Sequence, residues 1–304
     1  MDKKYIMELY LALFNRPAEK EGLEVWHNLA DENNWDKQAL ADNMIKAAVN
    51  LVNTSLEYAE IYPQYYNFDI KNREKVKAVI ESIYKTLFNK DYSVDPNGID
   101  GWTDNVMKTG NIAKAVVDLN YAADAYVKLE EAGAFDEEDE VYKAVKSYEN
   151  KLTVSEEFAK KINKADVNND GVYDLQIFKD LIDEVTYKQK SVKTAEETIK
   201  ELMEIEKYFQ NHSSKAENIS FEKTFEINGH KFPLITLSDE DFDFEAVIDD
   251  KHTIIPLVRF GDKIEPVSNP YIKEDDPTDD IPADDGNDMS AVIDNSTVVD
   301  LVDF

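Results

Sequence analysis

The sequence predicts a mainly α-helical protein, in which a duplicated helical bundle is followed by a small antiparallel β module and a disordered acidic tail. Three observations predict this fold class. Apolar residues recur at helical spacing through the first two thirds of the 304 residues, a tryptophan-bearing segment occurs twice, and strand-like alternation begins after His212. We expect the helical domain at residues 1–208, the β-rich module at 209–270 and the tail at 271–304.

The first helix is expected close to the amino terminus. Its apolar residues fall on one helical face, and they are Tyr5, Ile6, Leu9, Tyr10, Leu13 and Phe14. Pro17 ends this helix because proline has no backbone N–H to continue the ladder. Second and third helices are predicted around residues 23–29 and 40–52, and a longer helix of the first type returns at 76–88.

An internal repeat relates these helices. LYLALFNR at 9–16 aligns with IYKTLFNK at 83–90, which pairs Tyr10 with Tyr84, Phe14 with Phe88 and Asn15 with Asn89. Gly22, Leu23 and Trp26 then align with Gly98, Ile99 and Trp102 after two extra residues in the second loop. The two units, about 1–62 and 70–130, would each leave an apolar face uncovered, so we expect them to form one bundle.

Further helices are expected from Asp136 to Phe209. Thr153 with Glu156, and Thr194 with Glu197, match the capping box, in which a hydroxyl and a carboxylate bond to free amides at a helix start. The pattern predicts that helices begin at these two threonines.

The β module carries two hairpin signals. Asn228-Gly229 is the strongest short signal for a two-residue turn, and a second pair of strands is predicted about Gly261-Asp262. Pro256 lies within the second pair and indicates an edge strand, because it cannot donate to a sheet ladder.

Charge and composition exclude several classes of protein. The chain has 34 lysines and arginines against 64 aspartates and glutamates, a formal net charge of −30. Binding to nucleic acid needs a dense cationic surface, which no run of residues supplies. The apolar runs are far shorter than the roughly 20 residues of a membrane span. Cysteine is absent, which excludes disulfides and thiolate metal sites.

The two ends of the chain support an expectation about export. The segment up to Pro17 lacks the long apolar stretch and cleavage site of a secretory leader, so we expect it to remain as a helix. After Lys273 the sequence has eleven acidic residues and no lysine or arginine, and it closes with STVVDLVDF. Such a segment is expected to be disordered and to hold the export signal.

The sharpest local motif is DVNNDGVYD at 166–174. Asp166, Asn168, Asp170 and Asp174 occupy positions 1, 3, 5 and 9 of a calcium loop, Gly171 occupies position 6, and Val172 would offer its backbone carbonyl. Calcium requires six to eight oxygen ligands, which alternate residues of a tight loop can supply. Position 12 is Ile177 instead of glutamate, so Asp180, water or a carboxylate from elsewhere must complete the shell. The alternative is a solvated acidic turn.

Other motifs favour structural roles. DYSVDPNGID at 91–100 has part of the calcium spacing, but Asp95 and Pro96 fit the cap and first turn of a helix better. The four histidines show no metal-binding spacing, and no nucleophile, phosphate-loop or dinucleotide motif is present. We therefore expect no enzymatic activity.

The two repeats LYLALFNRPAEKEGLEVW and IYKTLFNKDYSVDPNGIDGW resemble the helical repeat of a domain family found in bacterial surface-layer (S-layer) proteins and in calcium-binding type I secreted proteins. The likeness is greatest to the amino-terminal region of Campylobacter-type surface-layer proteins. It extends through ENKLTVSEEFAKKI, and so covers about residues 1–208. The resemblance implies attachment to lipopolysaccharide on the outer membrane.

These observations lead to a functional expectation. We expect a secreted cell-surface protein without enzymatic activity that is exported by type I machinery. It would bind lipopolysaccharide or surface glycan, hold structural calcium and have a possible capacity for self-association. Lys3, Lys4, Arg16 and Lys90 are the cations nearest the repeats that could contact phosphate. A cytosolic calcium-binding regulatory or interaction protein is the alternative, and a secreted hydrolase with its active site in the β module is a third.

Overall fold

The computed structural model describes residues 1–216, 223–239 and 242–268. Within them, ten α-helices and one 3₁₀ helix precede five antiparallel strands, which confirms the predicted fold class for the described part of the chain. The expected disordered tail at 271–304 lies outside the described residues.

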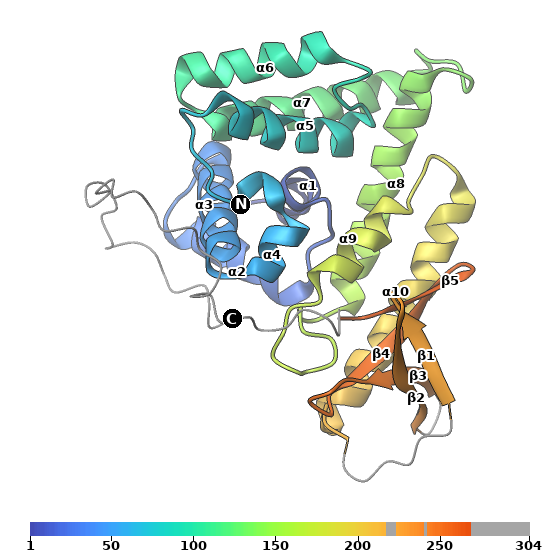
Figure 1. Ribbon diagram of the computed structural model, residues 1–304. Coiled ribbons are helices and arrows are strands. Elements are labelled where there is room, and N and C mark those ends of the chain that lie inside the picture. Colours follow the sequence, from blue (N-terminus) through green and yellow to red (C-terminus); the bar gives the residue numbers. More distant parts are fainter. Residues whose placement is uncertain (217–222, 240–241, 269–304) are drawn as a thin grey trace, which may run out of the picture.

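The helices of the two repeat units follow the same order. The first unit consists of α1 (Lys3–Phe14), α2 (Lys20–Glu32) and α3 (Lys37–Thr54), followed by α4 (Leu56–Ile61) and a 3₁₀ helix (Pro63–Tyr65). The second consists of α5 (Arg73–Phe88), α6 (Pro96–Thr109) and α7 (Ile112–Glu131). Figure 1 shows the second unit lying across the first, and α1 packs against α5 while α3 packs against α7. Equivalent helices therefore meet across the interface between the units.

The aligned asparagines end the first helix of each unit in the same way. Asn15 and Asn89 have φ of 48° and 51°, in the left-handed region. Their backbone N–H groups donate to the carbonyl oxygens of Leu11 and Lys85, at 2.9 and 3.0 Å. Asparagine tolerates this conformation better than most residues, which accounts for its presence at both helix ends.

Three further helices follow the two repeat units, and the first of these helices, α8, contacts both units. They are α8 (Glu140–Lys161), α9 (Leu175–Asp183) and α10 (Gln189–Asn211). The predicted helix starts at Thr153 and Thr194 are wrong, since both residues lie inside continuous helices. Thr153 donates its hydroxyl to the carbonyl oxygen of Glu149 at 3.1 Å, as threonines within helices commonly do.

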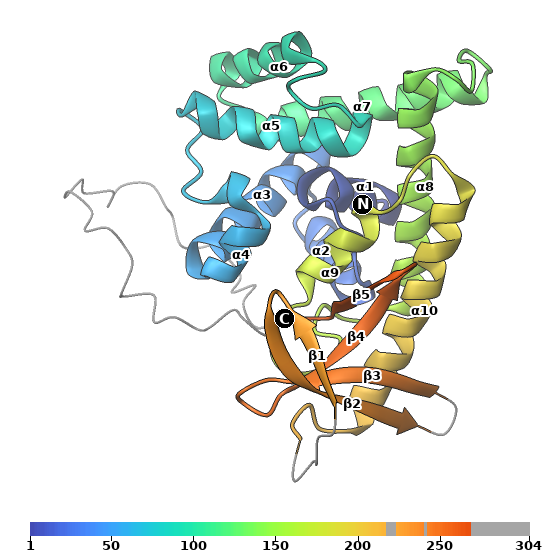
Figure 2. The ribbon, with the colours of Figure 1, turned by 45° about the vertical axis from the view of Figure 1, so that its right-hand side comes forward.

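The five strands form a meander with the order β1-β2-β3-β4-β5. They are β1 (Lys223–Ile227), β2 (His230–Asp239), β3 (Phe242–Ile248), β4 (Ile254–Phe260) and β5 (Lys263–Pro266). Asn228 and Gly229 form the predicted two-residue turn with φ of 50° and 83°. The second predicted hairpin joins β4 to β5. Figure 2 shows the twisted sheet in front of α10.

Pro256 does not mark an edge strand, because β4 pairs with both β3 and β5. Pro256 is the last residue of β4 that pairs with β3, opposite Ala246. Its carbonyl oxygen accepts the N–H of Val267 at 2.8 Å. The proline therefore lies where β4 changes its pairing partner, a place that needs no N–H donor.

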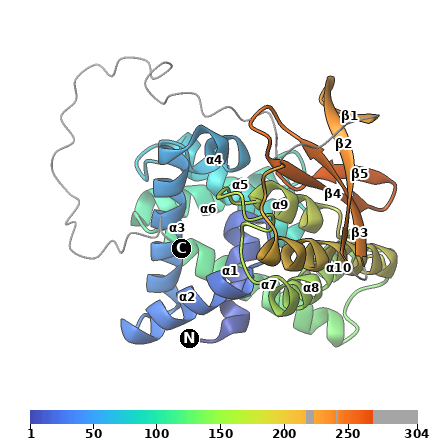
Figure 3. The same cartoon turned by 90° about the horizontal axis from the view of Figure 1, so that it is seen from below.

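The sheet has two apolar faces. Ile254, Val258 and Phe260 belong to the main core shared with the helices, and β4 packs on α10. Ile255 and Leu257 belong to a smaller cluster on the opposite face. Figure 3, a view from below, shows the sheet and α10 beside the first unit. Among the helices of the described residues, none combines the length and apolar character that crossing a membrane requires.

Candidate metal centre

The candidate site is the loop that joins α8 to α9. Two of its residues, Asn169 and Gly171, have positive φ of 57° and 92°. Because only glycine adopts such angles freely, Gly171 allows the sharp turn that the motif places at its sixth position.

Hydrogen bonds from backbone amides to carboxylates shape this loop. Asp166 accepts the N–H of Asp170 at 3.0 Å through Oδ1 and that of Gly171 at 2.9 Å through Oδ2. Asp170 Oδ1 accepts the N–H of Val172 at 2.8 Å, and Asp174 Oδ2 accepts the N–H of Val167 at 2.6 Å. The structure thus brings the predicted residues of the motif together in one curled segment.

Two side-chain oxygen atoms of the loop are buried without a hydrogen-bond partner among the described residues. Asp174 is only 1% exposed and Asn168 is completely buried. Within the described part of the chain, the Oδ1 atoms of both residues lack a hydrogen-bond partner. Burying such atoms costs free energy unless something binds them. A solvated acidic turn, the alternative interpretation of this motif, does not explain their burial.

The orientation of the Asn168 amide follows from its contacts. Its Nδ2 donates to Asp170 Oδ2 at 2.9 Å and to the carbonyl oxygen of Ile254 in β4 at 3.3 Å. Both contacts need a donor, so the other atom of the amide is the oxygen. The unpartnered oxygen of Asn168 is therefore available to a cation.

The charges of the site are poorly compensated. Burial raises the pKa of Asp174 well above its usual value, and the negative charges of Asp170, Asp166 and Glu57 raise it further, against the opposing effect of the Val167 amide. Burial also raises the pKa of Asp170, with smaller contributions from Asp166 and Asp249. A divalent cation would remove this repulsion.

The residues present fit calcium. Asp166, Asn168, Asp170, Asp174 and the backbone carbonyl of Val172 would hold the ion, as the spacing predicts. No three acidic or histidine side chains among residues 1–216, 223–239 and 242–268 already converge as a metal cluster. The fit therefore depends on the buried oxygens of Asn168 and Asp174, and the remaining ligands would close around an ion.

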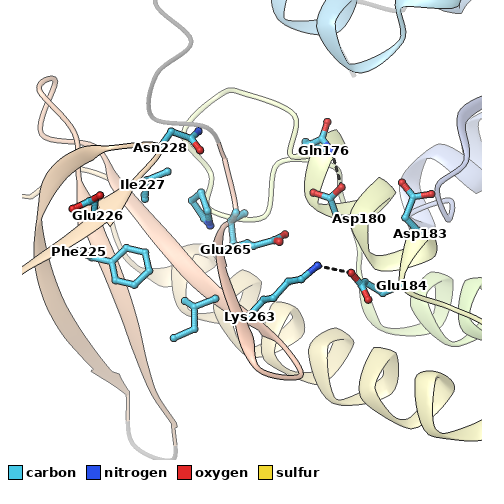
Figure 4. A pocket seen from close by; sticks show the side chains of 13 residues that line it. Gln176, Asp180, Asp183, Glu184, Phe225, Glu226, Ile227, Asn228, Lys263 and Glu265 are labelled. Atoms are coloured by element: carbon cyan, nitrogen blue, oxygen red, sulfur yellow. Dashed lines mark hydrogen bonds and ion pairs between the residues drawn. The ribbon is translucent and has the colours of Figure 1, made fainter.

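Ile177, at position 12 of the motif, and Asp180, which could have replaced its missing carboxylate, both lie outside the site. Ile177 is buried in the hydrophobic core. Asp180 accepts a hydrogen bond from Gln176 Nε2 at 2.7 Å, and its charged neighbours are Lys179, Asp183 and Lys263. Asp180 lines a cleft of about 490 Å³ between α9 and strands β1 and β5, as Figure 4 shows.

The cleft in Figure 4 is acidic, but part of its charge is paired. Lys263 Nζ donates to Glu184 at 2.8 Å, and Lys179 Nζ donates to Asp183 at 2.6 Å. We assign it no function.

Glu57 of α4 is a residue that the motif could not reveal. It is half-buried, and burial, then the charge of Asp170, then that of Glu60 raise the pKa of its carboxyl. The neighbouring Tyr58 ring contacts the Tyr173 ring, with centroids 6.3 Å apart. Glu57 is thus the carboxylate from elsewhere that could complete the shell.

The second candidate loop has the structural role that its sequence favoured. Asp95 caps α6 by accepting the N–H of Gly98 at 2.9 Å, and Pro96 is the first residue of the helix. Asp91 accepts the N–H and the hydroxyl of Ser93.

Comparisons with protein-family models, with curated proteins and with solved structures found no match for this chain.

Proposed function

We propose that this chain is a secreted, surface-layer-like anchoring or structural protein that binds lipopolysaccharide or surface glycan and is stabilised by calcium. One observation carries the calcium part of the proposal, namely the burial of both the Asp174 carboxylate and the Asn168 amide in a loop with calcium spacing. The surface role rests on the two sequence repeats and their resemblance to surface-layer proteins.

Calcium and export are connected by concentration. Calcium is scarce in the cytosol and plentiful outside the cell, so a site without the usual position-12 glutamate would fill after export. At a free concentration 100 times the dissociation constant, binding stabilises the folded state by about 2.7 kcal/mol. The acidic chain would then leave through type I machinery before it is fully stabilised.

The site suits a structural ion better than a sensor. Its loop connects α8 to α9, and Asn168 bonds to β4, so an ion held there would fasten the helices to the sheet. Sensor proteins usually use paired loops that open a helix pair. Only one loop in this sequence has oxygen side chains at positions 1, 3, 5 and 9 with glycine at position 6.

Contacts with phosphate groups would need surface cations. Arg16 is not available for this purpose, since its side chain is buried and its Nη1 donates to Glu19 Oε2 at 2.6 Å. Lys3 pairs with Glu24, Lys4 lies 3.9 Å from Glu8 and Lys90 lies 3.9 Å from Asp95, and all three lysine side chains stay partly exposed. These three lysines are therefore the predicted contacts that remain accessible to phosphate.

Thermal melting with calcium and with a chelator tests the metal. We expect calcium to raise the melting temperature of the parent by several degrees, and to have little effect on Asp166→Ala or Asp170→Ala. Asp91→Ala, in the loop that caps α6, is the matched control and should respond like the parent. An unchanged parent melting temperature would remove the calcium proposal.

Cell fractionation tests the location. With an active export channel we expect the protein on the cell surface and its release when lipopolysaccharide is truncated. A protein found only in the cytosol would contradict the proposal and favour a calcium-binding regulatory role.

A further inference from the structure

The two repeat units differ at one place that the sequence alignment makes equivalent. In the first unit, Arg16 pairs with Glu19, and its guanidinium lies 4.8 Å from the centre of the Tyr10 ring. Tyr62, which follows α4, packs edge-on against Phe14 with centroids 5.8 Å apart. The Tyr62 ring is 3% exposed, so it closes this part of the first unit.

The same positions are open in the second unit. Lys90 and Asp95 replace Arg16 and Glu19, at a distance of 3.9 Å instead of 2.6 Å. The Lys90 side chain is 39% exposed, compared with 10% for Arg16. Here a cavity of about 230 Å³ takes the place of the closed packing, and its walls include Tyr84, Phe88, Trp102, Tyr126, Lys90 and Asp95. We call it the second-unit cavity.

Tyr126 of α7 does not close this cavity as Tyr62 closes its counterpart. It makes a similar edge contact with Phe88, with centroids 6.2 Å apart, but it is 41% exposed and forms a wall. The first unit shows what such a site accepts, which is one ring bearing a hydroxyl group, placed on Phe14 and under the influence of the Arg16 charge. The second unit offers the same surroundings to a ring from outside the chain.

We propose that the second-unit cavity binds a single pyranose ring of a glycan. Its volume is below the usual range for a drug-sized ligand and suits one ring. The rings of Tyr84, Trp102 and Tyr126 line the cavity and can pack against the C–H groups of a sugar. Lys90 can donate to sugar hydroxyls and Asp95 can accept from them, because this pair is looser and more exposed than Arg16 with Glu19. A phenol has a single hydroxyl and would leave part of this rim unused.

This inference rests on the proposed glycan-binding function and names its site. The test is titration of the full-length protein with glucose, galactose, mannose and N-acetylglucosamine, followed by tryptophan fluorescence and ligand-observed NMR. We expect at least one sugar to bind with a dissociation constant on the order of millimolar, as single rings do. Tyr126→Ala and Lys90→Ala should each weaken that binding about tenfold, which corresponds to loss of one stacking or hydrogen-bonding contact.

Tyr121→Ala is the matched control, since Tyr121 is an exposed tyrosine on the same helix that does not line the cavity. It should bind sugar like the parent, and all variants should keep the parent melting temperature. The inference is overturned if none of the sugars binds, if binding survives Tyr126→Ala, or if p-cresol binds in the cavity while the sugars do not.

A parallel titration with purified lipopolysaccharide separates the two proposals. Binding by the parent that Tyr126→Ala leaves intact would contradict the cavity but keep the proposed function. A parent that binds no lipopolysaccharide or surface polysaccharide would contradict the proposed function itself.

Discussion

The side-chain amide of Asn168 donates a hydrogen bond to the carbonyl oxygen of Ile254 at 3.3 Å, across 86 residues of sequence. This contact attaches the candidate calcium loop to β4. Ile254 itself packs in the main core, so the loop is joined to the interface between the sheet and the helices. An ion that fixes the Asn168 oxygen would therefore stabilise the junction as well as the loop.

Asp174→Asn tests whether the buried carboxylate serves a cation. The amide keeps an acceptor for the Val167 N–H but removes the buried negative charge. In chelator we expect the variant to be at least as stable as the parent, because burial, and then the charges of Asp170 and Asp166, disfavour the ionised Asp174 carboxyl. In calcium the parent should gain roughly 1–3 kcal/mol and the variant little. Urea unfolding under both conditions measures the difference, and an equal gain in both proteins would show that Asp174 is not a ligand.

Glu57→Gln tests the carboxylate that the loop lacks at position 12. If Glu57 completes the shell, this change should weaken calcium binding about tenfold, as loss of one charged ligand does. Isothermal titration calorimetry measures the affinity directly. Glu60→Gln is the control, since Glu60 is exposed on the same helix. Equal affinities in the two variants would leave water as the remaining ligand.

Much of the fold could be predicted because its signals are local. The helices of both units follow from apolar spacing, and the turn at Asn228 follows from the positive φ that asparagine and glycine adopt. The predicted start at Thr153 failed for a reason that is not local. Tyr148 and Phe158 lie on either side of it and are both buried, so packing carries α8 through the capping sequence.

Only the part of the candidate site that depends on local sequence could be predicted. The positions from Asp166 to Asp174 could be predicted because a single turn brings them together. Glu57 lies more than 100 residues earlier, and its proximity depends on how α4 packs beside the loop. The cavity beside Lys90 could not be predicted from the sequence either. The aligned positions of the two repeats are similar, but the ring that fills the first unit is that of Tyr62, which lies outside the aligned segments.

Glu8 should make the bundle sensitive to pH near neutrality. Burial, followed by the charge of Asp124, raises the pKa of this α1 residue to about 7, although Lys4 and Lys37 oppose the shift. Because the pKa of Glu8 is higher in the folded than in the unfolded state, proton binding at Glu8 contributes to the free energy of unfolding. This contribution is fully present below about pH 4.5 and is lost as pH rises through about 7.

Glu8→Gln should therefore stabilise the protein at pH 8 by roughly 2 kcal/mol and have little effect at pH 5. Thermal or urea unfolding at the two pH values measures this. Glu21→Gln, at an exposed position of α2, is the control and should change stability little at either pH. A Glu8→Gln effect of the same size at both pH values would contradict the role of ionisation.

The aligned glycines should be required in both units for the same steric reason. A Cβ atom at Gly22 would lie closest to Glu19 Oε1 and 2.6 Å from the Tyr10 hydroxyl oxygen, and one at Gly98 would lie 2.7 Å from both Asp95 Oδ2 and the Tyr84 hydroxyl oxygen. Each tyrosine belongs to the first helix of its unit and each glycine to the second, and Glu19 and Asp95 directly precede that second helix, so the clash would displace both the tyrosine and this carboxylate. We expect Gly22→Ala and Gly98→Ala each to cost about 1–3 kcal/mol, the usual range for overpacking.

Gly101 provides the matched control for this prediction. It also lies within α6, but a Cβ atom there would meet no atom of the described residues within 4 Å. Gly101→Ala should therefore stabilise the protein by about 0.5–1 kcal/mol, because alanine loses less backbone entropy in a helix. Urea unfolding of the three variants compares them directly. A loss at Gly101 equal to that at Gly98 would mean that α6 tolerates no side chain at all, and the contacts with Tyr84 and Asp95 would not be the cause.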